Sequence, residues 1–329
     1  MATTTTSATT HGRSSRAKSL SRREAITAYL FISPYLITAA IFTVGLLAYA
    51  FYISFTNLSA TYAAQNAKFI GLDNYIRAFT DQDFLASLGN AFWYFVIVTF
   101  IQTIGAILLA VLLNAKLKGM RVFRTLLYSP SVASSIVMSL IFLWLYLPTG
   151  FINFFLGTDI PWLTTPDRIF APFWSGIGLG QTIPKFFQGP SVAWVSIMVL
   201  AIFTTIPTFM VMFLTALQDV PGYVYEAAAI DGATGPRAFW YITLPLLRPV
   251  IALVAILGTI GTFQVFDQVA ILTKGGPLKT TLTPAFLIYT KTLGTGTQAE
   301  AGFGAAMAFI LAFVIVAITL IQRRLIEQD

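Results

Sequence analysis

Three polar side chains interrupt a long apolar stretch near residue 265 and have the chemistry to bind a ligand. Gln264, Asp267 and Gln268 occur together, with Phe263 and Phe266 beside them. Spacings of three and four residues place 264, 267 and 268 on one face of a helix. A carboxylate and two amides can hydrogen-bond hydroxyl groups, and aromatic rings can cover the apolar C–H faces of a polyhydroxylated ligand. We predict that Phe263, Gln264, Asp267 and Gln268 line a substrate path.

The composition places these residues in an integral membrane protein. Of the 329 residues, 57% are hydrophobic and 10% are charged, and the mean hydropathy is +0.77. A soluble fold of this size carries more charge than that. The chain has no cysteine, which excludes disulfides and thiolate metal sites, and its single histidine, His11, lies in a polar tail. We therefore expect no metal site.

Catalytic motifs are absent from the sequence. It contains neither the Gly-x4-Gly-Lys-Ser/Thr phosphate loop nor a set of Ser, His and Asp residues suited to nucleophilic catalysis. The chain cannot hydrolyse ATP through such a loop. We expect no catalytic residue and no cofactor bound by this chain, and any energy for its function must come from another subunit.

Alternatives remain open for the polar side chains. Ionisable residues inside a membrane span are costly and therefore usually functional. Asp267 lies near the end of its apolar stretch, so water, Thr273 or a loop amide could satisfy it at the membrane surface instead. Gln102 and the group Thr204, Thr205 and Pro207 are weaker candidates for the path, because the threonine hydroxyls could bond back to their own helix.

Six apolar runs are long enough to cross the membrane, which takes roughly 20 helical residues. They are Leu30–Phe55, Phe92–Leu113, Leu126–Tyr146, Val192–Leu217, Val250–Leu272 and Phe303–Ile321. We predict an all-α polytopic fold with six transmembrane helices. The expected parts are a basic, disordered tail (1–27), the first span with its following loop (28–87), the remaining transmembrane domain (88–322) and a short C-terminal tail (323–329).

The connection between the fourth and fifth runs is polar and rich in small residues. Over residues 221–245 it predicts two short helices joined by a hinge. Asp219 is placed to cap the first helix, and Pro221 suits an early helical position. Gly232 can end that helix, because glycine adopts a left-handed conformation at little cost.

The second short helix is predicted from its own signals. Thr234 and Pro236 supply a cap and a first turn, and Pro245 ends or kinks the helix. In the first helix, Ala227, Ala228 and Ala229 leave one face almost without side-chain bulk. Another protein's backbone could therefore come close to that face.

Lys and Arg are unevenly divided among the connections. Five lie in the N-terminal tail, four in 114–125 (Lys116, Lys118, Arg121, Arg124), and Arg323 and Arg324 close the chain. The connections 57–91 and 147–191 are longer and less basic, whereas 273–302, with three lysines, is uninformative. Because basic residues favour the cytoplasmic side, both termini and the 221–245 segment are predicted cytoplasmic. The net charge of +7 follows this topology and does not indicate nucleic-acid binding.

Residues 226–245 resemble the signature of the membrane subunits of ATP-binding-cassette importers. The pattern is Glu-Ala-Ala, three residues, Gly, nine residues, Ile, one residue, Leu-Pro. It is filled at every position, by Glu226, Ala227, Ala228, Gly232, Ile242, Leu244 and Pro245. The resemblance implies a type I importer permease fold with this segment as the coupling helix that docks on an ATPase subunit. The alternative is an ordinary interfacial helix–turn–helix.

The resemblance also assigns roles and partners. Glu226 would fix the coupling helix (Glu226–Asp231) by a salt bridge or cap, while Ala227 and Ala228 keep the docking face low. The implied partners are a second permease subunit (usually a different chain), two ATPase subunits carrying ATP and magnesium, an extracytoplasmic solute-binding protein and membrane lipid. The implied location is the inner membrane.

Two further motifs resemble the carbohydrate branch of these permeases. They are Phe69–Tyr75 followed by Phe79, and Leu272–Pro277 with Thr280. Each alone could be plain turn chemistry around its glycines. Together they favour sugars over phosphate, sulfate, polyamines or amino acids. The expected cargo is a di- or oligosaccharide, and glycerol phosphate or a polyamine is the alternative. The aromatic stretch Phe170–Gly189 has no counterpart and suits an interfacial element or a partner surface.

Two other classes of protein make different predictions. An ion- or proton-coupled carrier predicts buried acid pairs near the membrane centre and internal repeats, and the sequence has neither. A structural membrane anchor would not need the polar face at Gln264, Asp267 and Gln268.

Overall fold

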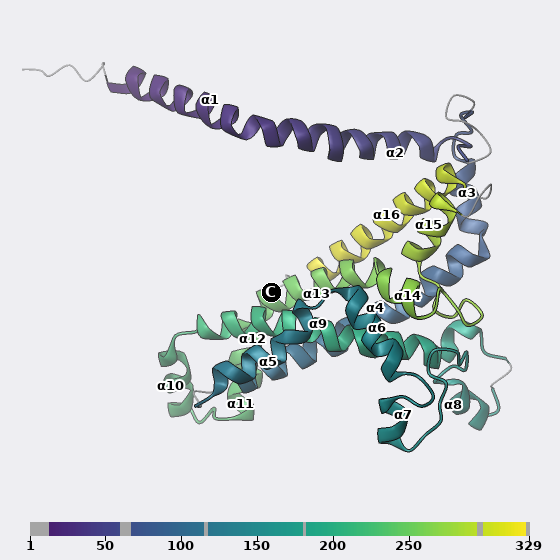
Figure 1. Ribbon diagram of the computed structural model, residues 1–329. Helices are drawn as coiled ribbons and strands as arrows, with labels where there is room; N and C mark the ends of the chain where they lie inside the picture. The colour runs from purple at the N-terminus through teal and green to yellow at the C-terminus, as the bar shows by residue number, and fades with distance from the viewer. Residues whose placement is uncertain (1–12, 60–66, 115–117, 180–181, 295–298, 327–329) are drawn as a thin grey trace, which may run out of the picture. The chain divides into compact units, whose positions relative to one another are not determined.

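The described residues with regular structure are helical. The structure, a computed structural model, describes residues 13–59, 67–114, 118–179, 182–294 and 299–326 (Figure 1). Within them the extended pairings are two isolated β-bridges, Thr56 with Phe69 and Arg168 with Ser191. The all-α prediction is confirmed. Two compact units, Met1–Ile53 and Ser54–Asp329, are described separately below.

The first unit is one helical stretch. Helix α1 (Arg13–Ala39) continues through a π-helical segment, η1 (Ala40–Gly45), into α2 (Leu46–Ser54). Its 30 residues from Glu24 to Ile53 are long and apolar enough to cross a membrane. The sequence predicts disorder up to residue 27, but the helix begins at Arg13 because Ala, Lys, Leu, Arg and Glu are good helix formers. Residues 1–12 of that predicted tail lie outside the described residues.

Helices α4 (Gln82–Leu113) and α9 (Val192–Gln218) pack along each other and form the centre of the second unit. The fully buried Trp194 stacks on Tyr94 with 4.7 Å between ring centroids, and its indole N–H donates to the carbonyl of Asn90 at 3.0 Å. Side chains cap both helices: Asp81 accepts from the amide of Phe84, and Ser191 from that of Trp194. This packing brings the start of α9 against the first half of α4.

The third apolar run is bent, not straight. The sequence predicts one straight span over Leu126–Tyr146. The structure has two helices there, α5 (Met120–Val132) and α6 (Ser135–Leu145), with a bend of 95° between them. Pro130 has no N–H to donate to the carbonyl of Leu126, and the hydroxyl of Ser129 donates to it instead at 2.8 Å. The described residues therefore hold five helices that could span a membrane, and a sixth only if the bent pair is counted.

The fifth apolar run is broken as well. Helix α13 (Arg248–Phe263) ends before α14 (Asp267–Leu272) begins, so residues 264, 267 and 268 do not share a continuous helix face as predicted. The buried Thr283 hydroxyl donates to the carbonyl of Val265 at 3.0 Å. Because the helix is broken here, the Val265 carbonyl accepts a hydrogen bond from a distant residue. In a regular helix it would accept one from its own helix.

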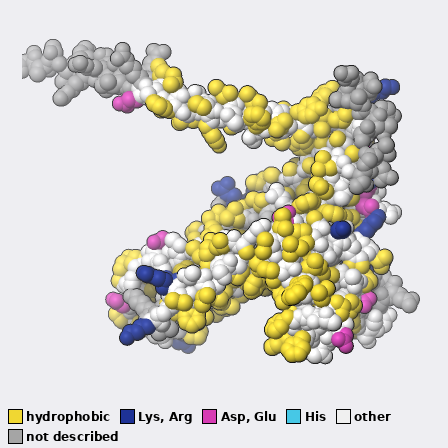
Figure 2. Space-filling model, viewed as in Figure 1, with side chains coloured by type: hydrophobic (Ala, Val, Ile, Leu, Met, Phe, Trp, Pro, Cys, Tyr) yellow, Lys and Arg dark blue, Asp and Glu magenta, His cyan; other side chains and the backbone are white. Residues whose placement is uncertain are grey.

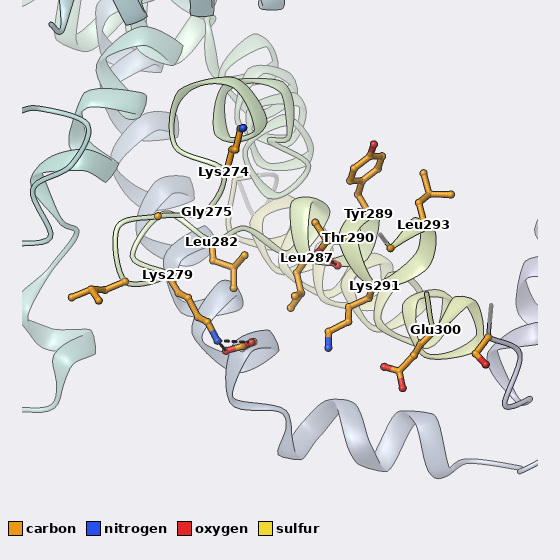
Figure 3. A pocket seen from close by; sticks show the side chains of 15 residues that line it. Lys274, Gly275, Lys279, Leu282, Leu287, Tyr289, Thr290, Lys291, Leu293 and Glu300 are labelled. Carbon is orange, nitrogen blue, oxygen red and sulfur yellow. Dashed lines mark hydrogen bonds and ion pairs between the residues drawn. The ribbon is translucent and has the colours of Figure 1, made fainter. Parts of the chain in front are cut away.

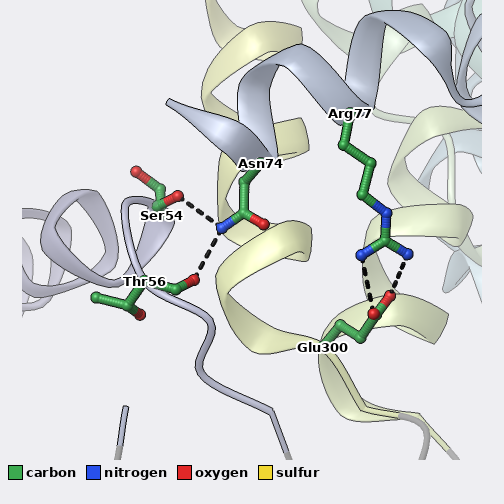
Figure 4. A network of polar contacts seen from close by, with 5 residues as sticks. All are labelled: Ser54, Thr56, Asn74, Arg77 and Glu300. Carbon is green, nitrogen blue, oxygen red and sulfur yellow. Dashed lines mark hydrogen bonds and ion pairs between the residues drawn. The ribbon is translucent and has the colours of Figure 1, made fainter. Parts of the chain in front are cut away.

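Short elements close one end of the second unit. They are α3 (Asp73–Thr80), α15 (Pro284–Leu293) and the start of α16 (Ala301–Ile326). Arg77 forms a bidentate ion pair with Glu300, both contacts at 2.9 Å, and its guanidinium lies 4.0 Å from the ring centroid of Phe303 (Figure 4). The amide of Asn74 donates to the carbonyls of Ser54 and Thr56 at 2.9 and 2.8 Å. These contacts join segments that are far apart in the sequence.

The 147–191 connection contains α7 (Phe151–Leu156), α8 (Ala171–Gly176) and the 3₁₀ turn η3 (Lys185–Gln188). Trp93 of α4 donates its indole N–H to the carbonyl of Phe186 at 2.9 Å, and the two rings lie 5.7 Å apart. Partial burial lowers the pKa of Arg168, whose guanidinium donates to the carbonyl of Gly189 at 2.6 Å. The unmatched aromatic stretch therefore packs on the start of α4.

Hydrophobic side chains cover much of the viewed face of the helices in the second unit, and charged ones gather near the helix ends (Figure 2). This distribution suits helices that lie in lipid along their length.

Candidate functional site

The segment predicted to couple to another protein contains the expected two short helices. Helix α10 (Gly222–Ile230) is followed by α11 (Pro236–Ala238), a π-helical segment η4 (Phe239–Thr243) and one turn, α12 (Leu244–Leu246) (Figure 1). Pro236 begins α11, as predicted. Pro245 lies inside α12 and marks a change of helix geometry just before α13.

Gly232 ends α10 by a left-handed backbone. Its φ is +76°, and no atom lies within 4 Å of a Cβ placed on it. The amide of Ala233 donates to the carbonyl of Ala228 at 2.8 Å, and that of Gly232 to Ala229 at 3.1 Å. This pair of bonds is the Schellman motif, which satisfies the last carbonyls of a helix. The predicted role of Gly232 is confirmed.

The predicted side-chain caps are wrong. Asp219 closes the preceding helix α9, where its amide donates to the carbonyl of Thr215, and α10 begins after Pro221 without a side-chain cap. Gly235, not Thr234, precedes α11.

The three alanines of α10 do not share one face. Ala228 is 5% exposed and lies against its own chain, whereas Ala227 is exposed. Successive residues of a helix point about 100° apart, so three consecutive alanines cannot form one face. The predicted low docking face therefore includes Ala227 but not Ala228.

Four exposed residues on one side of α10, here called the coupling face, are Tyr223, Glu226, Ala227 and Ile230. Ala229 is also exposed, but it points about 200° away from Ala227. Tyr223 is 70% exposed and Ile230 is 87% exposed. On the opposite side, the Tyr225 hydroxyl lies 3.3 Å from that of Thr243 in η4. Glu226 forms no ion pair or hydrogen bond with the residues that the structure describes, so the expected intrachain salt bridge or cap is not seen.

The rest of the signature lies beyond the hinge. Ile242 and Leu244 are half-buried, and Leu244 packs against the core formed by the adjoining ends of α4 and α9. Asp231 caps the end of α10, and Pro245 is exposed. Trp240 and Tyr241 are exposed aromatic residues that the sequence analysis missed. The signal that could have identified them is the presence of two large aromatic residues inside a connecting segment.

A polar cavity of about 330 Å³ lies between α4, α9 and the broken fifth run. Gln264, Asp267 and Gln268 all line it, even though they do not share a helix face. A neighbouring cavity of about 250 Å³ shares Ser135, Thr205 and Gln268 with it. Together the two are called the polar cavity below.

Phe263 is not part of this lining. It is 2% exposed and packs against Phe95, with 5.5 Å between ring centroids. Phe266 lines the cavity in its place. Further polar lining residues come from α4, α5, α6, α9 and α13 and were missed or ranked lower from sequence: Gln102, Ser131, Ser135, Thr204, Thr205, Thr208 and Thr262.

The electrostatics of the polar cavity are simple. Asp267 is its only charged lining residue among those that the structure describes. Thr273 does not satisfy that carboxylate, because its hydroxyl lies 2.7 Å from that of Thr281. Thr204 bonds back to the carbonyls of Leu200 and Ala201, as the alternative for it required. The cavity can hydrogen-bond a ligand, and it offers no cation for an anionic one.

Lysines instead line a separate pocket of about 930 Å³ beside α15 (Figure 3). Lys274, Lys279 and Lys291 line it together with Asp83 and Glu300. Lys279 is paired with Asp83 at 2.6 and 2.8 Å, which joins the 273–283 loop to the start of α4. Within the described chain, no group of His, Cys, Asp and Glu residues could hold a metal ion.

The described residues thus form a helical fold with several candidate membrane spans, a polar cavity and an exposed face on α10. The chain matches the family described as "Binding-protein-dependent transport system inner membrane component" over residues 106–328. It therefore belongs to that family, as the signature at 226–245 implied. The match covers the polar cavity from Ser131 onward and the whole coupling segment.

Two individual relatives are similar in sequence to this chain along most of its length. The lactose transport system permease protein LacF of Rhizobium radiobacter is 29% identical over 313 residues, which cover 92% of this chain and 95% of LacF. The trehalose/maltose transport system permease protein MalF of Thermococcus litoralis is 32% identical over 306 residues, which cover 90% of this chain and 92% of MalF.

A solved structure shows the same fold. The crystal structure of a bacterial ABC transporter involved in the import of the acidic polysaccharide alginate superposes with a TM-score of 0.73. The alignment covers 94% of this chain and 98% of that one, at 20% identity. The chain thus has the fold of an ABC importer permease.

The helix end at Gly232 leads to a testable prediction. Replacing Gly232 with Ala should destabilise the end of α10 by about 1 kcal/mol, because a Cβ disfavours a left-handed backbone. Gly232→Asn should cost less, since Asn tolerates this conformation. Hydrogen exchange of the peptide covering residues 228–236 should be fastest in the Ala variant and intermediate in the Asn variant. Equal exchange in all three proteins would show that φ at residue 232 does not hold the helix end.

Proposed function

We propose that this chain is the permease subunit of an ATP-driven importer and forms half of the translocation path for a neutral di- or oligosaccharide. The observation that carries the proposal is the polar cavity, with its amides, hydroxyls and single carboxylate. Relatives named for lactose and for trehalose and maltose transport support a saccharide.

The charge of the cavity separates neutral saccharides from the other candidates. Glycerol phosphate or an acidic polysaccharide would need a cationic partner in a desolvated site, and none lines the cavity among the described residues. A polyamine carries several ammonium groups, for which Asp267 alone is too little. A neutral saccharide needs only hydrogen bonds and aromatic contact, which the amides, hydroxyls and Phe266 supply.

An ion-coupled carrier fits less well. Such a carrier needs buried acidic groups, and no Asp or Glu is fully buried within the part of the chain that the structure describes. Family membership and the coupling face both favour an external energy source.

The energy is transmitted through the coupling face. Two ATPase subunits, which carry ATP and magnesium, each grip one coupling helix of a permease pair, and this chain itself catalyses nothing and binds no cofactor. The second permease subunit is a different chain, and an extracytoplasmic binding protein delivers the ligand. Ile230 and Tyr223 supply apolar contact, and the missing side-chain bulk at Ala227 lets the ATPase backbone approach.

The topology follows from charge. The proposed topology has six spans, with the bent pair α5 and α6 counted as one, and both termini and residues 221–245 on the cytoplasmic side of the inner membrane. The first span and its loop occupy 28–87, and the rest of the transmembrane domain occupies 88–322. The tight basic connection after α4 supports this orientation, and Arg124 there donates to the carbonyl of Leu113 at 2.6 Å.

The coupling proposal predicts a face-specific effect. Ala227→Asp places a charge in the docking contact, so saccharide-stimulated ATP hydrolysis by the assembled transporter should fall by about tenfold or more. Ala229→Asp is the matched control, because it introduces the same side chain on the same helix about 200° away. ATP hydrolysis and membrane insertion of both variants are measured in parallel. Loss of coupling in Ala229→Asp alone would place the docking face on the other side of α10.

The cavity proposal predicts a role for the carboxylate. Asp267→Asn should raise the saccharide concentration for half-maximal uptake by about tenfold, because a hydrogen bond to a charged acceptor is roughly twice as strong as a neutral one. Asp159→Asn, in an exposed loop, is the control and should leave uptake unchanged. Uptake of radiolabelled saccharide into proteoliposomes provides the measurement. An unchanged half-saturating concentration in Asp267→Asn would remove Asp267 from the path.

A further inference from the structure

Two neighbouring polar atoms on α4 have no hydrogen-bond partner among the residues that the structure describes. Gln102 Nε2 and Thr99 Oγ1 are the buried side-chain nitrogen and oxygen atoms without a hydrogen bond in the described part of the chain. The two residues lie three positions apart, on one helix face. Buried polar groups are almost always paired, because an unpaired one loses its hydration without compensation. Two unpaired atoms side by side require an explanation.

Exchanging the positions of Oε1 and Nε2 in the Gln102 amide still leaves one of these two atoms without a partner. The Thr205 hydroxyl oxygen lies 2.8 Å from Gln102 Oε1 and 2.7 Å from the carbonyl of Ala201. A hydroxyl carries one hydrogen, so it can donate to only one of them. If Thr205 bonds back to Ala201, a rotated amide can donate to Thr205 and leaves Oε1 unpaired instead. In either orientation, one polar atom of Gln102 has no partner within the described ranges of the chain.

A glycine on α13 lets this amide pack closely against that helix. A Cβ on Gly258 of α13 would lie 2.5 Å from Gln102 Nε2 and 3.6 Å from Thr99 Oγ1. Gly258, Gln102 and Thr205 all line the polar cavity with Asp267. Gln102 is 1% exposed, so solvent outside the cavity does not satisfy it.

We propose that Gln102, together with Thr205 and Gly258, forms a subsite that binds one hydroxyl group of the ligand, and that Gln102 determines specificity for it. A hydroxyl both donates and accepts, so it complements either orientation of the amide. A phosphate only accepts and an ammonium only donates. The inference rests on the proposed function and extends it to α4, across the cavity from Asp267.

A purely structural role for Gln102 makes the opposite prediction for stability. If the amide served to hold α4 against α9 and α13, Gln102→Met would lower the thermal unfolding midpoint. If one amide atom is unpaired until ligand arrives, Met of similar length removes that cost, and the midpoint of the ligand-free transporter should stay equal or rise. Ligand affinity should nevertheless fall.

The experiment uses the complete transporter in proteoliposomes. Lactose, maltose, trehalose and arabinotriose are screened, and the one that wild type imports fastest is the probe. Gln102→Met should raise its half-saturating concentration by about tenfold without lowering the thermal midpoint. Gly258→Ala, whose Cβ displaces the amide, should act in the same direction. Thr103→Val is the control, because the Thr103 hydroxyl bonds back to the carbonyl of Thr99 at 2.7 Å and does not line the cavity.

Each other outcome overturns a defined part of the account. A half-saturating concentration within about twofold of wild type in Gln102→Met would remove Gln102 from the ligand contacts. A clearly lower thermal midpoint would make Gln102 a structural residue and overturn the subsite. If wild type itself imports none of the four saccharides, the proposed function fails, and the inference fails with it.

Discussion

Every polar group that these helices carry into an apolar environment must find a partner, and most of the architecture follows from that constraint. Trp194 finds the carbonyl of Asn90, and the Asn90 side chain finds the carbonyls of Lys279 and Leu282. Ser129 bonds the carbonyl that Pro130 leaves free. Among the described residues, partners are missing at Gln102 and Thr99, and Gln102 lines the polar cavity. One exception to the constraint thus coincides with the place where a ligand is proposed to bind.

The two proposed working regions are joined by continuous helices. Helix α13 begins directly after the coupling segment and ends at the cavity, and its 16 residues span roughly 24 Å at 1.5 Å per residue. Helix α9 runs between the same two regions and carries Thr205 to the cavity. The half-buried Leu244 anchors the coupling segment to the core between α4 and α9. A displacement of α10 would therefore reach the cavity through packed helices and not through a flexible loop.

Local signals in the sequence predicted local structure well. The left-handed turn at Gly232 was predictable because it depends on the chemistry of one residue, and the fourth span matched α9 because its apolar run is uninterrupted. The sequence analysis missed the breaks near Pro130 and Gln264. The break near Gln264 depends on a hydrogen bond to the carbonyl of Val265 from Thr283, which lies eighteen residues further along the chain. Helix orientation was also out of reach: the packing of Tyr225 near Thr243 decides that Ala228 faces inward. Gln264, Asp267 and Gln268 do meet in one cavity, but through a broken helix and not along one face.

The central claim is that the coupling face of α10 docks on an ATPase subunit, and the absence of native cysteine makes it directly measurable. Single substitutions Ala227→Cys and Ala228→Cys are each combined with one cysteine in the docking groove of the ATPase, and disulfide cross-linking is followed in the assembled transporter. The account predicts rapid cross-linking from position 227 and little from position 228, which faces its own chain. Cross-linking from position 228 alone, or labelling of position 227 by a membrane-impermeant maleimide outside intact cells, would contradict it.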